Sequence, residues 1–520
     1  MPRVGNLVWT LLLLLCLFVP ASAQAADDDQ PERRPLTEQE LLRKRINESL
    51  AGVRDPKAPK IQTLHGPELS DREKVVHVLS RLGFGPTPGE VDEVLKTGGW
   101  QAWVKRQMDP VTIDDATCDR VINEKFKWAS MSMTELQKEY DGDNQNIRQL
   151  HREVPEYVVT RAVLSNRQFY ELMCDFWRNH FCVDQPETNE KSRSWTDADY
   201  ENTVIRKNVF AHFGDMLMAS AHHPAMLEYL DNKLSRADAW NENYAREVME
   251  LHTLGADRGY GNLDVQELSK VLTGWNYDDS FQFIFRPEWQ QKGPKLWLGM
   301  RIPEGYEGGM LALNTLATHP NTAQFISEKL CRYLVNDNPP PTLVRHVAQV
   351  FRQTKGDLPK VYMAIISSRE FMSRENYRAK FKTPFQFTVS ALRATGAKLN
   401  DANRVATMIG KMGEQLYNCA DPTGYFDTAE RWMDSGVLTT RWQFSWDLVR
   451  GAVGGAKMSN SFFDRYQADK PEEIEQKMIE DLTGGDAGDR ELVALKDAAA
   501  QKDIPKMTSI MLGSPSFQQR

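Results

Sequence analysis

Cysteine is scarce in this chain, which has six in 520 residues. Five of them follow residue 23 and are far too few for a disulfide scaffold in a chain this long. The sequence has no Cys-x-x-Cys pair and no Cys/His spacing typical of zinc sites, so nothing indicates a thioredoxin-like motif or a zinc finger. Because five is an odd number, at least one thiol stays free if this part of the chain folds in an oxidising compartment.

Other signatures are also missing. The sequence contains no Gly-x-Ser-x-Gly elbow, no P-loop and no Rossmann fingerprint, and no motif implies a cofactor. The net charge of −8 gives no general electrostatic attraction to nucleic acid. After residue 23, no uncharged apolar run reaches the roughly 20 residues of a membrane-spanning helix, so we expect no integral membrane segment in the mature chain.

The first 23 residues have the three parts of a secretory signal. Arg3 supplies a positive charge, residues 7–19 are apolar, and Ala21-Ser22-Ala23 is a small-x-small cleavage site after Pro20. The apolar run is shorter than a membrane span. We therefore predict a cleaved signal peptide at 1–23 and export to the periplasm or the extracellular space. The alternative is an uncleaved membrane anchor.

The next segment, residues 24–69, is charged and rich in proline, which predicts a flexible linker. Ser70 and Glu73 then form a capping box, which marks the start of a helix. We expect residues 70–520 to form a single large domain, with a candidate sub-boundary near 276–308.

The spacing of apolar residues predicts a mainly α fold, a large multi-helix globular core with a small β-hairpin insertion. In the insertion, Phe281, Phe283 and Phe285 recur at every second position, and residues 295–298 are the expected return strand. Helices are expected near 70–83, 87–98, 100–108, 119–140, 155–183, 199–220, 224–232, 242–254, 264–275, 309–317, 321–335, 341–353, 358–367, 383–396, 400–416, 435–453, 471–483 and 488–500.

The densest group of chemically active side chains lies at residues 241–255. On a helix, Asn243, Glu247 and Glu250 share one face, because they are four and three residues apart. Such a stripe suits a bound cation or an acid–base pair. The alternative is structural, because Arg246 lies four residues from a glutamate on either side and can pair with both.

Other residues extend this candidate set. Asp231 closes the preceding helix and can face the stripe, so Glu247, Glu250 and Asp231 are candidate metal ligands. His252 points to a different face from Glu250, so it does not form the Glu-x-x-His pattern of di-iron bundles. It remains a candidate catalytic residue.

An earlier helix offers a second candidate region. Asp175 and Asn179 share a face, with Arg178 beside them. His180 follows directly and is a candidate ligand or base. The alternative is a buried histidine with satisfied hydrogen bonds.

The same segments resemble a large bacterial family catalogued as domain of unknown function 1800. The matching segments are 77–88, 176–181, 223–232, 241–255, 264–265, 273–275, 329–332, 382–385 and 512–517. The resemblance implies a secreted, α-rich protein with no established activity. It also implies frequent company with an exported family, domain of unknown function 1501, that is similar to sulfatases and phosphatases. Relatives often carry His-Asp after a Pro-Glu-Trp element, whereas here Gln290 and Gln291 follow, so any chemistry of that pair is lost.

Two classes of function remain. The first is an exported partner or scaffold for another exported protein, with a protein of the 1501 family as the candidate partner. The second is an extracytoplasmic hydrolase or cation-dependent enzyme that uses the carboxylates of the 241–255 helix.

Overall fold

The computed structural model describes residues 68–141, 144–183, 194–419, 421–467 and 470–520. All of them belong to one compact unit, residues 63–520. The predicted signal peptide at 1–23 and nearly all of the predicted linker at 24–69 lie outside the described residues. Leu69, predicted as the last linker residue, is buried in the core.

The prediction of a mainly α-helical fold is confirmed. The first half of the described chain contains α2 (Asp71–Arg81), α3 (Glu90–Lys96), α4 (Gly99–Gln107), α5 (Ala116–Lys125), α6 (Met133–Tyr140), α7 (Asn144–Leu164), α8 (Gln168–His180), α9 (Ser194–Tyr200), α10 (Phe213–His222), α11 (Pro224–Tyr229), α12 (Asn243–Glu247) and α13 (Asn262–Val271). The second half contains α14 (Tyr306–Thr318), α15 (Pro320–Leu334), α16 (Pro341–Gln353), α17 (Leu358–Ile366), α18 (Pro384–Ala394), α19 (Ala402–Lys411), α20 (Ser435–Val449), α21 (Asn460–Asp464), α22 (Pro471–Thr483), α23 (Asp489–Ala500), α24 (Ile504–Leu512) and α25 (Pro515–Gln518).

The short strands of the described residues form two-stranded antiparallel sheets: β1 (Trp275–Tyr277) with β2 (Phe283–Phe285), β3 (Lys295–Trp297) with β4 (Met300–Ile302), and β5 (Lys398–Leu399) with β6 (Ala456–Lys457). The predicted insertion is present, but its predicted pairing is wrong, because β2 does not return through residues 295–298. Leu298 and Gly299 both have positive φ, 46° and 73°, as a two-residue hairpin turn requires. This tight turn pairs β3 with its own neighbour in sequence.

Several helices predicted as continuous are divided. The helix predicted at 155–183 breaks between α7 and α8, where the Asp115 carboxylate accepts hydrogen bonds from Asn166 N (2.6 Å) and Ser165 Oγ (2.7 Å). Because Asp115 comes from a separate segment, local spacing carried no sign of this break. Helix α8 ends at His180, so Cys182 lies just beyond it and does not share a helix with Cys174. The ranges predicted as single helices at 119–140 and 199–220 also contain more than one helix each.

Two segments have π-helical hydrogen bonding, η3 (Glu201–Arg206) and η5 (Val248–Thr253). The continuous α-helix predicted at 242–254 is therefore wrong in its second half. There Leu254 N donates to Met249 O at 2.8 Å, a step of five residues. Single π turns inside helices often accompany functional sites.

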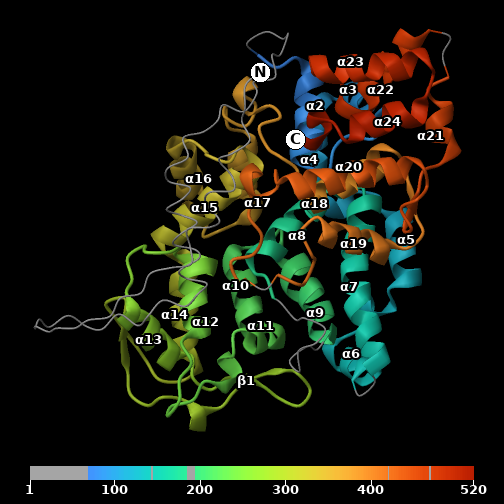
Figure 1. The fold of residues 1–520 in the computed structure, drawn as a ribbon. Helices are drawn as coiled ribbons and strands as arrows, with labels where there is room; N and C mark the ends of the chain where they lie inside the picture. Colours follow the sequence, from blue (N-terminus) through green and yellow to red (C-terminus); the bar gives the residue numbers. More distant parts are fainter. Residues whose placement is uncertain (1–67, 142–143, 184–193, 420, 468–469) are drawn as a thin grey trace, which may run out of the picture. The chain divides into compact units, whose positions relative to one another are not determined.

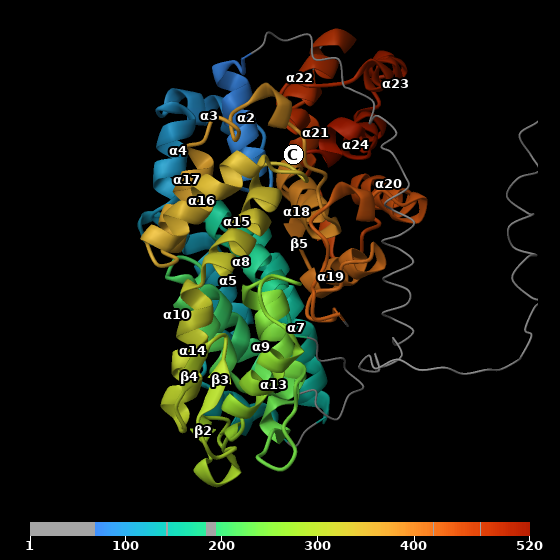
Figure 2. The same cartoon turned by 90° about the vertical axis from the view of Figure 1, so that its left-hand side faces the viewer.

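Long-range contacts join helix α2, early in the domain, to segments near the end of the chain. In both views the blue α2 lies beside the red α22 (Figures 1 and 2). The buried Arg81 of α2 donates to the backbone carbonyls of Leu334 (3.1 Å), Asn376 (3.0 Å) and Arg520 (2.6 Å). One guanidinium therefore fastens α2 to three distant segments, including the end of the chain.

Helix α8 runs through the interior, and the ribbon shows it surrounded by other helices in both views (Figures 1 and 2). Of its 13 residues, 11 are buried, so its polar side chains must find partners inside the protein. No helix in the described part of the chain is both long and apolar enough to cross a membrane.

Candidate functional site

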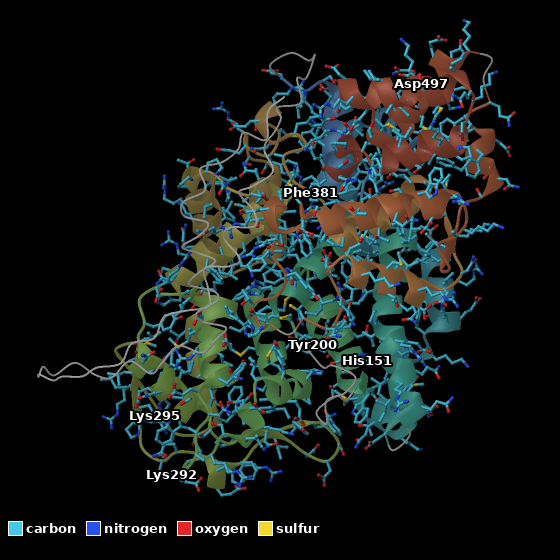
Figure 3. All side chains as sticks on the ribbon, viewed as in Figure 1. His151, Tyr200, Lys292, Lys295, Phe381 and Asp497 are labelled. Carbon is cyan, nitrogen blue, oxygen red and sulfur yellow. The ribbon has the colours of Figure 1, made fainter. Side chains whose placement is uncertain are left out.

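A small cavity lies at the C-terminal end of α8. Its volume is about 40 Å³, which leaves room for a few water molecules or one small polar group. Tyr200 of α9, labelled in Figure 3, forms part of its wall. The polar side chains that line it include Asp175, Arg178, Cys182, Glu414, Tyr417 and Cys419.

Buried ion pairs connect α8 to the π-helical segment η3. Arg178 donates from Nε and Nη2 to the two carboxylate oxygens of Glu201, both at 2.9 Å. Arg206 pairs in the same two-pronged way with Glu171, at 2.9 and 2.5 Å, and Tyr417 OH donates to Glu201 at 2.5 Å. Burial acts to raise the pKa of Glu201, but Arg178 and its other partners hold that pKa below its ordinary value. Glu201 is thus a buried, ionised carboxylate that needs its arginine.

One donor of Arg178 has no acceptor. Its Nη1 atom is buried and makes no hydrogen bond to any described residue. The carboxylate of Asp175 is 3.8 Å from it, beyond hydrogen-bond length. Since a buried charged donor without a partner is costly, this atom indicates a bound acceptor in the cavity, either water or a ligand.

Two carboxyl groups of the cavity have raised pKa values. Burial and the nearby Asp175 raise the pKa of Glu414 from 4.5 to about 8, so this side chain is protonated at neutral pH. It accepts a hydrogen bond from Phe385 N at 2.7 Å. Burial also raises the pKa of Asp175, against the opposing influence of Arg178 and of Tyr333, whose hydroxyl donates to Asp175 at 3.0 Å. Two interacting carboxyl groups in one buried site can divide the roles of acid and base.

The two candidate histidines are brought together by the fold. His180 Nε2 donates to the backbone carbonyl of His252 at 3.1 Å, which leaves Nδ1 to accept from Lys329 Nζ at 3.0 Å. Burial and the Lys329 charge lower the pKa of both histidines, to about 3 for His252, so both are neutral. Both nitrogens of His180 are engaged, which favours the structural interpretation of this residue.

The stripe predicted at 241–255 lies at the surface. Asn243 is exposed, and Glu247 and Glu250 are half-buried. Arg246 pairs with Glu242 at 3.0 Å, as predicted, but forms no ion pair with Glu250. The wider π turn of η5 alters the alignment of residue 250 with the α-helical turn before it. A functional role for Asn243, Glu247 and Glu250 stays a prediction.

Asp231 follows α11 in the left-handed region, with φ 58°. Among the described residues, which include Glu247, Glu250 and Asp231, no three His, Cys, Asp or Glu side chains are grouped to hold a metal ion. Glu247, Glu250 and Asp231, the predicted metal ligands, therefore do not form a metal-binding cluster. The preceding helix does start as predicted, because His223 Nδ1 accepts from Ala225 N at 3.1 Å.

The family of the chain follows from a comparison with protein families. The model described as protein of unknown function (DUF1800) matches residues 77–519. The chain belongs to this family. The match includes the cavity and the 241–255 segment, and it confirms the resemblance seen in the sequence. No curated protein and no solved structure matches this DUF1800 protein.

Part of the cavity lining could be predicted from the sequence. Asp175, Arg178 and Asn179 stood out as a polar face of one helix, and this face does line the cavity. The sequence did not indicate Glu414 or Cys419 as cavity residues. Both lie more than two hundred residues after α8, at or just beyond the end of the helix predicted at 400–416. The one available signal was chemical: Glu414 is a lone carboxylate at the end of an apolar helical pattern.

Proposed function

We propose that this DUF1800 protein is an exported hydrolase whose acid–base pair is Asp175 and Glu414. The unpaired Nη1 of Arg178 in the same cavity carries the proposal, because a buried charged donor needs an acceptor from water or substrate. Export rests on the predicted signal peptide. The carboxyl pair replaces the 241–255 stripe as the proposed centre.

The chemistry needs only groups that line the cavity. Asp175 takes a proton from a water molecule held beside Arg178, and the water oxygen attacks the scissile bond. Glu414, which holds its proton at neutral pH, gives it to the leaving group. A cavity of about 40 Å³ accepts only one small polar end of a substrate, so most of the substrate stays outside.

A substrate panel tests this proposal. The wild type, Asp175→Asn and Glu414→Gln are assayed with chromogenic esters, glycosides and phosphoesters. We expect turnover by the wild type that falls above about pH 8, where Glu414 loses its proton. Turnover falls about 10²- to 10⁴-fold in each variant, the usual contribution of a general acid or base.

The matched control is Glu242→Gln, which removes a carboxylate of a surface ion pair and leaves the cavity intact. This variant is expected to keep full activity, and a melting curve of each variant verifies folding. Absence of turnover in the wild type, or equal turnover in all four proteins, would contradict the hydrolase proposal.

A second candidate function is a partner role beside an exported protein of the 1501 family. It is favoured by α20, where Trp442 and Trp446 are 69% and 41% exposed and one helical turn apart. Tryptophan is enriched among the anchors of protein interfaces. We expect purified 1501-family protein to bind the wild type in calorimetric titration, and the double change of both tryptophans to Ala to weaken binding at least tenfold. Leu311→Ala, at another exposed apolar residue, is the control, and equal affinities would exclude α20 as the interface.

A further inference from the structure

Two of the cysteines meet at the cavity. Cys182, just beyond α8, and Cys419, on the segment after α19, both line it. Their sulfur atoms approach one oxygen, the backbone carbonyl of Asp421, at 3.7 Å from Cys182 and 3.4 Å from Cys419. The Cys182 thiol is also hydrogen-bonded to Cys419. The fold therefore places the thiols of Cys182 and Cys419, which are distant in sequence, next to each other.

The segment that carries Cys419 is held against α8 by specific contacts. Asn179 Nδ2 donates to Tyr425 O at 2.8 Å, and Tyr425 N donates to Asn179 Oδ1 at 2.6 Å. Gly424 has φ +76°, and a Cβ there would lie 2.3 Å from Asn179 O. Only glycine permits this approach without strain. These contacts hold the segment after α19 against α8 and so keep the two thiols close together.

The other three cysteines are unsuited to exchange. Cys118, Cys174 and Cys331 are fully buried, and burial raises the pKa of each thiol, to about 12 for Cys118 and Cys331. A buried thiol with a raised pKa is a slow attacking group, because the thiolate is the nucleophile. Cys182 is also buried with a raised pKa, but unlike these three it lies beside Cys419 at the cavity, so it can serve as the second thiol of the pair. Cys419 is half-buried, so it is the accessible member of the pair.

We propose that Cys182 and Cys419 are a redox pair that closes to an intramolecular disulfide by exchange with an external disulfide, and that this bond fixes the wall of the cavity. The Cys419 thiolate attacks a donor disulfide, such as glutathione disulfide or an oxidised dithiol protein, and expels one donor thiolate. The Cys182 thiolate then attacks the Cys419 sulfur and expels the second. Two cysteines are oxidised, the donor disulfide is reduced to two thiols, and these thiols take up the two protons.

The exchange suits an exported protein, because disulfides persist outside the cytoplasm. The hydrogen bond to Cys419 and burial raise the pKa of Cys182 well above its ordinary value, while the Lys329 charge acts to lower it. Once Cys419 is in the mixed disulfide it no longer takes part in that thiol hydrogen bond, so the largest cause that raises the pKa of Cys182 is removed before the second step. The bond would join the end of α8 to the segment that supplies Glu414 and Tyr417. The disulfide would therefore restrict the relative positions of the cavity walls, and no bound ligand is needed for this effect.

The test compares full-length protein treated with dithiothreitol or with glutathione disulfide. Oxidation should remove two titratable thiols per chain, counted after denaturation. Mass spectrometry should find one disulfide-linked peptide pair containing Cys182 and Cys419. A disulfide that closes so long a loop should raise the melting temperature of the wild type by roughly 3–5 °C.

The variants Cys182→Ser and Cys419→Ser should lose this temperature shift, and Cys331→Ala should keep it. An unchanged thiol count, a linked peptide with other cysteines, or a shift that survives in Cys419→Ser would each overturn the proposal. None of these measurements uses turnover, so the result for the redox pair is independent of the result for the hydrolase proposal.

Discussion

Replacing Glu201 with Gln should lower the free energy of unfolding by about 3–5 kcal/mol, the cost of leaving a buried charge unpaired. Glu201 is fully buried and accepts two hydrogen bonds at 2.9 Å from Arg178, which is 8% exposed. Glutamine keeps the shape but not the charge, so the buried guanidinium loses its closest counter-ion. Denaturant titration of both proteins measures the difference.

The surface pair of Glu242 and Arg246 provides the comparison. Its N···O distance of 3.0 Å resembles that of the buried pair, but both side chains are about a third exposed. Water screens this pair, so Glu242→Gln should cost less than about 1 kcal/mol. Adding Arg178→Met to Glu201→Gln should recover part of the loss, because it removes the uncompensated charge. Equal losses in Glu201→Gln and Glu242→Gln would show that burial of the Arg178–Glu201 pair has no energetic consequence.

The second large effect is that the free energy of unfolding depends on pH through the ionisation of Glu414. Its pKa is about 8 in the folded protein and 4.5 ordinarily, so the folded state binds one more proton than the unfolded state between these pH values. Stability rises with pH only where the unfolded state binds more protons, so here it falls as pH rises. The contribution lost between pH 4.5 and 8 is on the order of 5 kcal/mol, at about 1.4 kcal/mol for each pKa unit.

Glu414→Gln isolates this effect, because glutamine stays uncharged at every pH and can still accept the hydrogen bond from Phe385 N. The stability of the variant relative to the wild type should rise steadily from pH 5 to pH 8.5. Urea unfolding at half-unit pH steps measures the difference in unfolding free energy between the two proteins. Titrating groups that do not interact with Glu414 cancel in this difference. Parallel curves for the two proteins would mean that Glu414 is ionised in the folded state at neutral pH.

Local chemistry determined part of this protein. The capping box of Ser70 and Glu73 forms as predicted, with Ser70 N donating to Glu73 at 2.7 Å, because both groups lie within one turn. Apolar spacing likewise determined the mainly α class. The family could be identified from the motif at 241–255 and its companions, and Asp175 and Arg178 could be placed on one helix. Each of these features depends on residues that are close in sequence.

Only the tertiary structure decided the rest. The cavity forms because α8 meets a segment more than two hundred residues further along, which brings Glu414 and Cys419 to Asp175 and Cys182. The raised pKa of Glu414 arises from burial, and burial depends on every element packed around it. The hairpin pairing and the break after α7 were also decided by turns and by a distant carboxylate. Periodicity shows which face of a helix is buried, but not what covers it, so the sequence predicted the helices and the fold assembled the site.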